Sequence, residues 1–588
     1  MVDFKSRYLK IIKKYLKDKF IDNNTAKVME IIKMSIIEVD SNKYKNCAIW
    51  GAGQHTDNLM KYFSMDFKKV NFIIENNLEL AKEKFKAFKA ITPEEINSNN
   101  IDCIIISSYA SRKEITKSIE RFNKNIKIID IYESLQEKNI NLNLPFYILS
   151  DGYIKINEYL QKLKECKENI EKAFILENLL LEYINLRDFK NIFKIIECYK
   201  KLKIVDNDKF DNLFNDLEEM LIDLKEALKM KKDNILLLYI DALRYKDVNN
   251  LGNMKYLKEL SENNVKFTNA FSTSITTYES MVSCLSGQMP YYNNNHKREF
   301  IEEEESRFIN KALNNNYNIN FYILGSDRFI NSNNINYKDG GTYCSKTLWN
   351  YLCDLTSSNN KNISMLYFLQ ESHTPHMGGN YIENFEIHKT PFTCGDCQFK
   401  QSEEQYINQY RKSLQYLDEQ LEFYLSFLNE ENDTVIFSDH GQLIEGATKK
   451  LNDLDTILGW HDDRFKVNLI IKSNKFKKQK VKKLFSLINI NDLLCGIIDG
   501  KLNIKYEKYI EMQFSSIRNK IIRGKFKSEK KDDYIDGFKV YRDKNYKLVI
   551  TGLKKIRAFK LCKDKEIEIF HSVSMEKIKK RFLVNDIL

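Results

Sequence analysis

The sequence contains no long apolar run and no recognisable leader. No stretch of about eighteen apolar residues occurs in the 588, so we expect no membrane-spanning helix. The first residues, MVDFKSRYLKIIKKYLKDKF, lack the uninterrupted apolar segment and cleavage site of a signal peptide and predict an amphipathic helix. The eleven cysteines are odd in number and scattered, which favours a reducing compartment. We therefore expect a cytoplasmic protein, either free or bound peripherally at the inner face of a membrane.

A strong excess of one charge is also missing. The 93 Lys and Arg and the 82 Asp and Glu are interspersed, and a net charge of +11 is small for this length. This balance suits anionic substrates or a phospholipid surface and requires no nucleic acid. A Lys-, Asn- and Ile-rich composition explains the charge more simply. The length predicts three or four domains.

Periodicity divides the first 232 residues into three parts. Residues 1–40 are expected to be N-terminal helices. Residues 41–140 alternate strand-like runs with helical stretches, which predicts a small Rossmann-like domain with a parallel sheet. Residues 141–232 are rich in Leu, Ile, Lys and Glu at helical spacing and predict a helical spacer.

A Gly-x-Gly turn follows the first strand of the Rossmann-like segment. Gly51 and Gly53 would let the backbone approach a phosphate at the N-terminus of the next helix. Thr56 stands where the usual fingerprint has its third glycine. The segment resembles small nucleotide-binding-like domains attached to sugar-modifying and polysaccharide-biosynthesis enzymes. Cofactor binding at Gly51 and Gly53 and a scaffold or docking role both stay open.

The next 268 residues, 233–500, carry strongly apolar strands with polar ends. Apolar runs at 234–242, 321–326, 363–372, 434–441 and 467–473 predict a sheet covered on both faces. Acids and histidines stand at the ends of these runs, where open α/β sheets place their sites. Residues 501–588 alternate in shorter steps and predict a small antiparallel sheet.

Residues capable of chemistry gather between 233 and 500. Six of the eight histidines lie between 296 and 461, more than an even scatter would give. The segments are YIDALR, with Asp241 and Arg244; TTYESMVSCLSG, residues 276–287; ESHTPH, with His373 and His376; FSDHG, with Asp439 and His440; and GWHDDR, with His461. Acids, imidazoles and hydroxyls in this order suggest a divalent metal and a nucleophile.

These segments, together with the cysteine-bearing segment from Pro391, resemble the alkaline phosphatase superfamily in its sulfatase-like branch. Within that branch they are most similar to the phosphoethanolamine transferases. The resemblance covers about residues 235–500. It implies an α/β fold, an alkaline phosphatase/sulfatase-like sandwich with a central, mostly parallel sheet. The sequence departs from the family pattern at Asp241 (usually Glu), Phe368 (His) and Gln442 (Glu), and it lacks the family's membrane-embedded helices.

The resemblance also places the nucleophile. In sulfatase-type helices it lies ten residues before the glycine that closes the helix, and counting back from Gly287 gives Thr277, with Thr276 as the neighbouring alternative. A helix N-terminus offers free N–H groups and a partial positive charge, which favour an alkoxide and a phosphoryl group. Classical sulfatases need Cys or Ser in a Cys/Ser-x-Pro-x-Arg setting, which this helix lacks. Phosphoryl transfer is therefore favoured over sulfate-ester hydrolysis.

The resemblance implies one divalent ion, zinc or alternatively manganese, held by Asp241, Thr277, Asp439 and His440. His373 and His461 would hold a second divalent metal or the phosphate and leaving group, and Arg244 would support Asp241. His376 does not stand at a family position.

The implied function is a metal-dependent transferase in surface-polysaccharide biosynthesis. It would move phosphoethanolamine, or a similar phospho-alcohol, through a phospho-threonine from a phospholipid or soluble donor to a glycan or glycolipid acceptor. The alternatives are a phosphodiesterase or hydrolase that uses water, and a catalytically degenerate binding module.

Two smaller features stay open. Cys394 and Cys397 would bind zinc, form a redox pair or remain a reduced remnant of a family disulfide. The lysines of 472–483 predict a solvated helix face, with a lipid-surface patch as the alternative.

Overall fold

The computed structural model describes residues 2–16, 34–35, 44–53, 56, 70–85, 88–108, 111–137, 151–202, 208–323, 329–340, 342–386, 401–446, 459–517, 520–528, 530, 533, 535–562 and 565–582. The chain forms two compact units, residues 16–152 and residues 1–15 together with 153–588.

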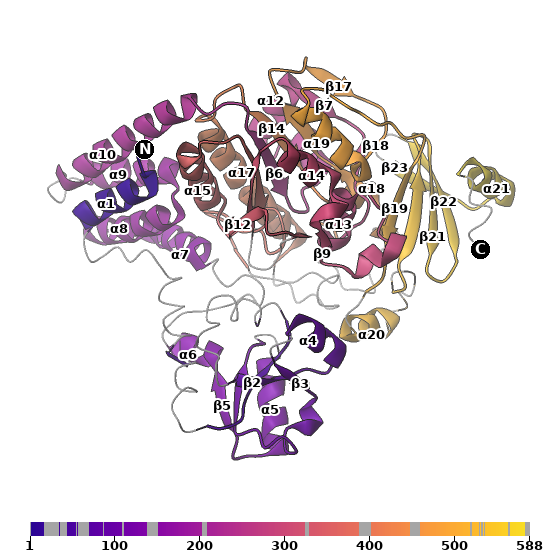
Figure 1. Ribbon diagram of the computed structural model, residues 1–588. Coiled ribbons are helices and arrows are strands. Elements are labelled where there is room, and N and C mark those ends of the chain that lie inside the picture. Colours follow the sequence, from indigo (N-terminus) through magenta and orange to yellow (C-terminus); the bar gives the residue numbers. More distant parts are fainter. Residues whose placement is uncertain are drawn as a thin grey trace. The chain divides into compact units, whose positions relative to one another are not determined.

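The smaller unit is built on an open parallel sheet (Figure 1). Its strands are β1 (Cys47–Trp50), β2 (Val70–Ile74), β3 (Lys89–Ile91), β4 (Cys103–Ile106) and β5 (Lys127–Asp130), in the order β3-β2-β1-β4-β5. The helices are α4 (Leu78–Lys84), α5 (Arg112–Phe122) and α6 (Ile131–Glu137). Successive side chains of β1 and β4 enter two different cores, so both strands are buried throughout. The predicted alternation of strands and helices is present.

A helical layer begins the larger unit. It contains α1 (Phe4–Leu16), α7 (Asp151–Glu165), α8 (Asn169–Leu186), α9 (Phe189–Lys201) and α10 (Asp208–Lys229). Tyr8 of α1 packs on the rings of Phe189 and Trp349 at 5.6 Å each and donates a hydrogen bond to the Ile184 carbonyl. The first helix, which the sequence placed in a separate segment, therefore packs on the predicted spacer.

An eight-stranded sheet forms the centre of the larger unit. Its strands are β6 (Ile235–Ile240), β7 (Val265–Phe267), β10 (Asn318–Ile323), β12 (Ile335–Asp339), β13 (Asn362–Phe368), β14 (Asp433–Phe437), β16 (Leu469–Lys472) and β17 (Gln479–Val481). The order is β12-β10-β13-β6-β14-β16-β7-β17, and only β16 runs antiparallel to its neighbours. Every residue of β6, β13 and β14 is buried. The predicted α/β fold with a mostly parallel central sheet is confirmed.

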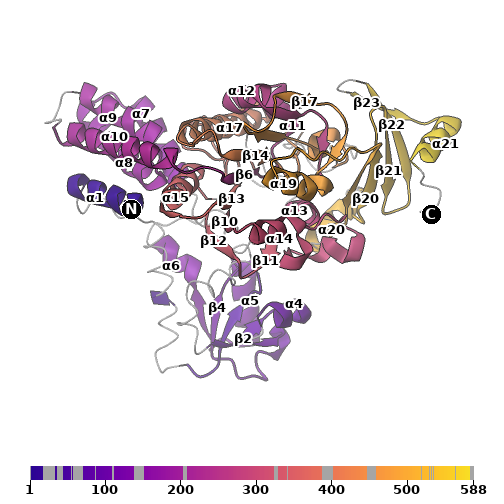
Figure 2. The same cartoon turned by 45° about the horizontal axis from the view of Figure 1, so that its top comes forward.

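Helices cover both faces of this sheet (Figures 1 and 2). One face carries α12 (Lys255–Asn263), α15 (Cys344–Ser357) and α17 (Glu403–Leu425), and the other carries α13 (Thr277–Ser286), α14 (Arg307–Asn314) and α19 (Ile490–Ile498). Shorter elements are α11 (Tyr245–Asn249), α18 (Asp462–Phe465), the pair β9 (Phe300–Glu302) and β11 (Phe329–Asn331), and the three strands β8 (Ala270–Phe271), β15 (Lys466–Val467) and β18 (Phe485–Ser486).

The C-terminal part contains the expected antiparallel sheet. Its strands β19 (Ile510–Phe514), β20 (Phe538–Arg542), β21 (Tyr546–Thr551), β22 (Ile556–Cys562) and β23 (Lys565–Ile569) pair in chain order and are accompanied by α20 (Lys520–Ser528) and α21 (Ser572–Arg581). The sheet is joined to the start of α13, because Gln513 donates its backbone N–H to the Thr273 carbonyl at 2.8 Å.

Among the described residues no helix combines the length and the apolarity needed to cross a bilayer. The nine cysteines in the described ranges are free thiols. Cys394, Cys397 and His388 lie outside the described residues.

Candidate metal centre and nucleophile

Four of the predicted site residues meet at the carboxyl ends of β6 and β14. Ligand atoms of Asp241, Asp439 and His440 lie within 4.8 Å of one another, and all three residues are buried. The Thr277 hydroxyl oxygen lies 3.4 Å from Oδ2 of Asp241 and 3.4 Å from Nε2 of His440. The structure thus brings together the residues that the sequence predicts to share one ion.

The backbone explains why the two carboxylates are neighbours. Strands β6 and β14 are parallel and paired in register up to Tyr239 and Phe437, so the two chains leave the sheet side by side. Ala242 has a φ of 55°, and this left-handed residue turns the chain directly after Asp241. Its N–H then donates to Oδ1 of Asp439 at 3.1 Å. The turn therefore fixes one carboxylate against the strand that carries the other.

Two buried tyrosines orient the carboxylates. Tyr239 donates its hydroxyl hydrogen to Oδ2 of Asp439 at 2.8 Å, and Tyr367 donates to Oδ2 of Asp241 at 2.6 Å. The two rings stack with centroids 4.7 Å apart. Burial raises the pKa of Tyr239 well above its usual range, so its phenol stays a donor. The sequence prediction does not include either residue, because each looks like an ordinary phenol near the end of a buried strand.

Replacement of Tyr367 by phenylalanine is expected to weaken binding of a divalent metal by roughly 10–100-fold, because Asp241 loses the donor that orients it. The dissociation constant for Zn²⁺ is measured by competition with a chromogenic chelator. Tyr322→Phe is the matched control. Tyr322 lies on another strand, β10, and donates its hydroxyl hydrogen to Asp354 of α15 at 2.8 Å. Equal Zn²⁺ affinity of Tyr367→Phe and the control would contradict the orienting role.

His440 presents one nitrogen to the cluster. Its Nδ1 lies 2.7 Å from the Gly441 carbonyl oxygen, so Nδ1–H donates there and Nε2 keeps its lone pair. Gly441 is required for close approach, because a Cβ at this position would lie 1.9 Å from the Asp463 carbonyl oxygen. The Gly441 N–H also donates to the Arg464 carbonyl at 2.8 Å. Only glycine allows these two loops to meet.

Thr277 is the first residue of α13, and Thr276 is its N-cap in extended conformation. The contacts with Asp241 and His440 are made by Thr277, not by Thr276. The helix ends at Gly287, whose φ of 71° suits glycine. The Thr277 hydroxyl therefore combines a helix N-terminus with the acid–imidazole cluster.

His373 lies in a loop that joins the site through Gln442. The Gln442 side-chain N–H donates to the Ser372 carbonyl at 2.5 Å, a bond that an ionised glutamate at this position would not make. The ring Nδ1–H of His373 donates to the Thr374 carbonyl at 2.9 Å. Burial lowers the pKa of His373, while that hydrogen bond and the charge of Asp439 oppose the shift. The lowered pKa favours a neutral His373.

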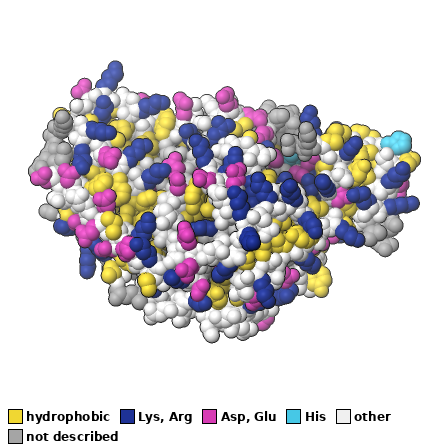
Figure 3. Space-filling view, turned by 90° about the horizontal axis from the view of Figure 1, so that it is seen from above, with side chains coloured by type: hydrophobic (Ala, Val, Ile, Leu, Met, Phe, Trp, Pro, Cys, Tyr) yellow, Lys and Arg dark blue, Asp and Glu magenta, His cyan; other side chains and the backbone are white. Residues whose placement is uncertain are grey.

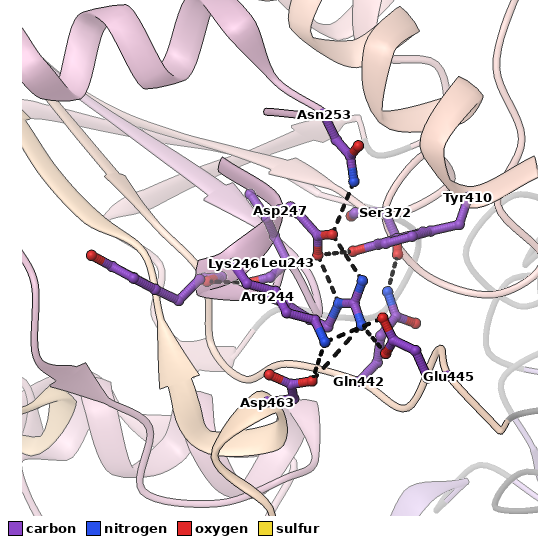
Figure 4. A network of polar contacts seen from close by, with 12 residues as sticks. Leu243, Arg244, Lys246, Asp247, Asn253, Ser372, Tyr410, Gln442, Glu445 and Asp463 are labelled. Carbon is purple, nitrogen blue, oxygen red and sulfur yellow. Dashed lines mark hydrogen bonds and ion pairs between the residues drawn. The ribbon is translucent and has the colours of Figure 1, made fainter. Parts of the chain in front are cut away.

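Arg244 does not touch the cluster. Its guanidinium donates to both carboxylate oxygens of Asp247, at 2.7 and 2.8 Å, and to Glu445 at 2.5 Å (Figure 4). It also lies over the ring of Tyr410, 5.2 Å from the centroid. These contacts tie the segment after β6 to the loop after β14. The structure places Arg244 as a positioning residue rather than at the reacting atoms.

The remaining predicted histidines also lie apart from the cluster. His461 caps α18, where its Nδ1 accepts the Asp463 N–H at 3.2 Å, and its Nε2 lies 3.8 Å from Glu566. Among the described residues, none of its contacts is with Asp241 or Thr277. His376 is buried against α17, with Nε2 3.1 Å from the Tyr406 hydroxyl. Structural roles account for the contacts of both.

Side chains of the smaller unit occupy the hydrogen-bonding groups of the turn at Gly51. Gly51 has a φ of 117°. The Ala52 N–H, which a phosphate would need, donates to the Glu75 carboxylate at 3.0 Å. The Thr56 hydroxyl contacts the Gly51 carbonyl and Ser107. Gly53 has open space around its Cα. Cofactor binding at Gly51 and Gly53 stays a prediction.

The cluster fits a divalent metal. It offers two carboxylates oriented by phenols, one imidazole Nε2 and one hydroxyl, a mixed N/O set that suits zinc or manganese. Residues 233–499 match the sulfatase family model. We call this region the sulfatase-like domain, after the family model that it matches. Residues 43–129 match the model described as C2185-like, N-terminal, and the sequence matches none of the curated proteins with which it was compared.

Several solved structures are similar to part of this chain at low identity. The phosphonate monoester hydrolases from Silicibacter pomeroyi and Agrobacterium radiobacter are each 12% identical, cover 60% of this chain and 95% of their own, and have TM-scores of 0.44. An alkaline phosphatase superfamily protein from Vibrio parahaemolyticus is 13% identical, covers 61% of this chain and 87% of its own, and has a TM-score of 0.39. The predicted sulfatase-like assignment of about 235–500 is confirmed by the family match.

Proposed function

We propose that the sulfatase-like domain is a metal-dependent phosphotransferase of the alkaline phosphatase superfamily. It moves phosphoethanolamine, or a similar phospho-alcohol, through a phospho-threonine at Thr277 onto a hydroxyl of a glycan or glycolipid. The donor is a phospholipid or a soluble phosphodiester, and the setting is surface-polysaccharide biosynthesis on the cytoplasmic side of a membrane. The donor and the acceptor are inferred from the sequence resemblance, and the location is inferred from the odd number and the scatter of the cysteines.

One observation supports this proposal most directly. The Thr277 hydroxyl stands at the N-terminus of α13 and lies 3.4 Å from both a carboxylate oxygen and an imidazole nitrogen of the metal-type cluster. Threonine also argues against sulfate-ester chemistry, because its branched Cβ cannot give the aldehyde that sulfatases form from Cys or Ser. A hydroxyl that attacks phosphorus directly needs no such oxidation.

The residues of the site have separate tasks in the proposed reaction. Asp241, Asp439, His440 and Thr277 would hold the ion, and a bound divalent ion supplies charge that lowers the hydroxyl pKa and neutralises phosphate oxygens. Thr277 attacks the phosphorus of the donor, the bond to the donor alcohol breaks, and the alcohol takes up a proton. The acceptor hydroxyl then attacks the phospho-threonine and releases Thr277. His373, in the loop that Gln442 joins to the site, would hold the phosphate or the departing alcohol.

The proposal is tested by mass spectrometry of the peptide that carries Thr277. The Zn²⁺-loaded protein is incubated with phosphatidylethanolamine in detergent and quenched in acid, and a phosphoethanolamine adduct on Thr277 is expected. Thr276→Ala should keep the adduct and Thr277→Ala should lose it. An adduct on another residue, or one that persists in Thr277→Ala, would overturn the assignment. Release of the adduct by water alone, with no transfer to a sugar acceptor, would identify a phosphodiesterase instead.

A further inference from the structure

A run of lysines forms one edge of the larger unit. Residues 472–483, KSNKFKKQKVKK, contain seven lysines and no acid. The structure contradicts the predicted helix face: β16 ends at Lys472, an irregular segment follows, and β17 is a short strand. Within the described residues β17 pairs only with β7 and is the last strand of the sheet. We call residues 472–483, together with Lys266, the lysine edge.

The charges of the lysine edge are crowded and poorly neutralised. Lys480 stands directly opposite Lys266 in the β7–β17 register. Burial lowers the pKa of Lys266; the charge of Glu262 opposes this shift, and the neighbouring charges of Lys480 and Lys258 add to it. Of the seven lysines in the run, Lys475 alone forms an ion pair among the described residues, with Asp433 at 2.7 Å. Figure 3 shows Lys and Arg side chains gathered across the middle of the face seen from above.

Protection of an edge strand explains only part of this pattern. A lysine on an outer strand discourages edge-to-edge pairing, and Lys480 is enough for that. The exposed Lys477 and Lys478 precede the strand and Lys482 and Lys483 follow it, so they protect no open backbone. Lys478 donates to the Asn263 side chain and Lys483 lies over the Tyr506 ring, but neither forms an ion pair among the described residues. Like charges kept together without acids cost stability, which points to an external anion.

Only the part of the lysine edge that follows β17 lies at the same end of the sheet as the metal-type cluster. The lysines between β16 and β17 lie at the opposite end, because Lys472 stands opposite Thr434 near the start of β14. Strand β16 is antiparallel to both β14 and β7, and β17 is parallel to β7, so β17 runs in the direction of β14. The residues after β17, Lys482 and Lys483, therefore leave the sheet at the edge where Asp439 and His440 follow β14. Three strand spacings separate β14 from β17, which is about 14 Å.

We propose that the lysine edge docks this protein onto a membrane surface rich in anionic phospholipid, with Lys482 and Lys483 at the end of the sheet that carries the metal-type cluster. This rests on the proposed function, because a lipid donor must reach Thr277. The run has seven lysines and no arginine. Compact ammonium groups suit a diffuse field of headgroups, whereas nucleic-acid readout relies on arginine forks and stacking aromatics. A bilayer is thus favoured over nucleic acid.

The test is cosedimentation with vesicles of phosphatidylcholine containing increasing fractions of phosphatidylglycerol. We expect binding to rise with the anionic fraction and to fall with salt. Each lysine near the surface is worth roughly fivefold in affinity, so the triple variant Lys477→Gln, Lys478→Gln, Lys482→Gln should bind on the order of 100-fold more weakly. The matched control neutralises three exposed lysines of α9 and α10, Lys194, Lys201 and Lys225, and should bind like the wild type.

Turnover of a soluble p-nitrophenyl phosphodiester separates docking from catalysis. The lysine-edge triple variant should keep this activity, because none of its lysines touches Thr277 or the cluster. If wild type ignores anionic vesicles, or if both triple variants bind them equally, the docking proposal fails while soluble turnover still supports the enzyme. Binding to duplex DNA in preference to vesicles would also overturn it. Vesicle binding without soluble turnover would instead reject the proposed function.

Discussion

Thr277→Ala is expected to lower turnover of a p-nitrophenyl phosphodiester by about 10³-fold or more, because the proposed nucleophile is removed. The three buried ligands Asp241, Asp439 and His440 remain in place. Metal content should therefore fall much less than activity. The measurement is kcat/KM at saturating Zn²⁺, together with the bound zinc per protein molecule by elemental analysis.

Two further variants make this expectation specific to Thr277. Thr277→Ser keeps a hydroxyl at the N-terminus of α13 and should retain activity within about tenfold of wild type. Thr276→Ala removes the hydroxyl of the N-cap, which has no contact with Asp241 or His440, and should change activity little. If Thr277→Ala keeps most of the turnover, or if Thr276→Ala abolishes it, the nucleophile is misplaced.

Asp439→Asn is expected to weaken Zn²⁺ binding by more than about 100-fold, a larger loss than removal of an orienting partner gives. Asp439 accepts hydrogen bonds from Tyr239, Ala242 and His440, so the variant keeps the shape of the site while losing one negative charge. Without metal the variant should be at least as stable as wild type, because one of two neighbouring buried carboxylates is neutralised.

Thermal unfolding with and without Zn²⁺ measures both effects. Ligand at about 100 times its dissociation constant stabilises a protein by roughly 2.7 kcal/mol, so wild type should melt at a clearly higher temperature with zinc. Asp439→Asn should show almost no shift. Asp418→Asn is the control, because Asp418 is a buried carboxylate on α17 whose pKa burial raises to about 6, and it binds backbone N–H groups instead. A zinc shift in Asp439→Asn equal to that of the control would exclude Asp439 as a ligand.

The residues at the ends of strands are the part of the site that sequence can predict. Asp241, Asp439 and His440 follow apolar runs directly, and parallel neighbours end at the same edge of a sheet. Thr277 follows from its distance to Gly287 along one helix. The inferences at the strand ends need only local spacing and the order of the strands, whereas the position of Thr277 also needs the helix spacing that the family resemblance implies.

Contacts that depend on the register between neighbouring strands cannot be predicted from the spacing of residues in the sequence. Tyr239 and Tyr367 look like ordinary core residues of β6 and β13, and their task appears only when the neighbouring carboxylates are placed. His461 and Arg244 follow the right segments in the chain, but one caps a short helix and the other binds Asp247. The predicted helix face over residues 472–483 is wrong. The spacing of the lysines there is neither helical nor strictly alternating, so it indicates no regular element.

Tyr8 anchors the first helix to the layer of α8 and α9. The larger unit is therefore formed by residues that precede and residues that follow the smaller unit in the chain. The smaller unit is thus an insertion, tethered at two points, between the first and second helices of a body that carries the reaction. Such an inserted unit can be exchanged or elaborated in evolution without interrupting the sequence of the larger unit elsewhere, provided its two ends still meet α1 and α7. Removal of the first sixteen residues, by contrast, strips a packing partner from the reacting half of the chain.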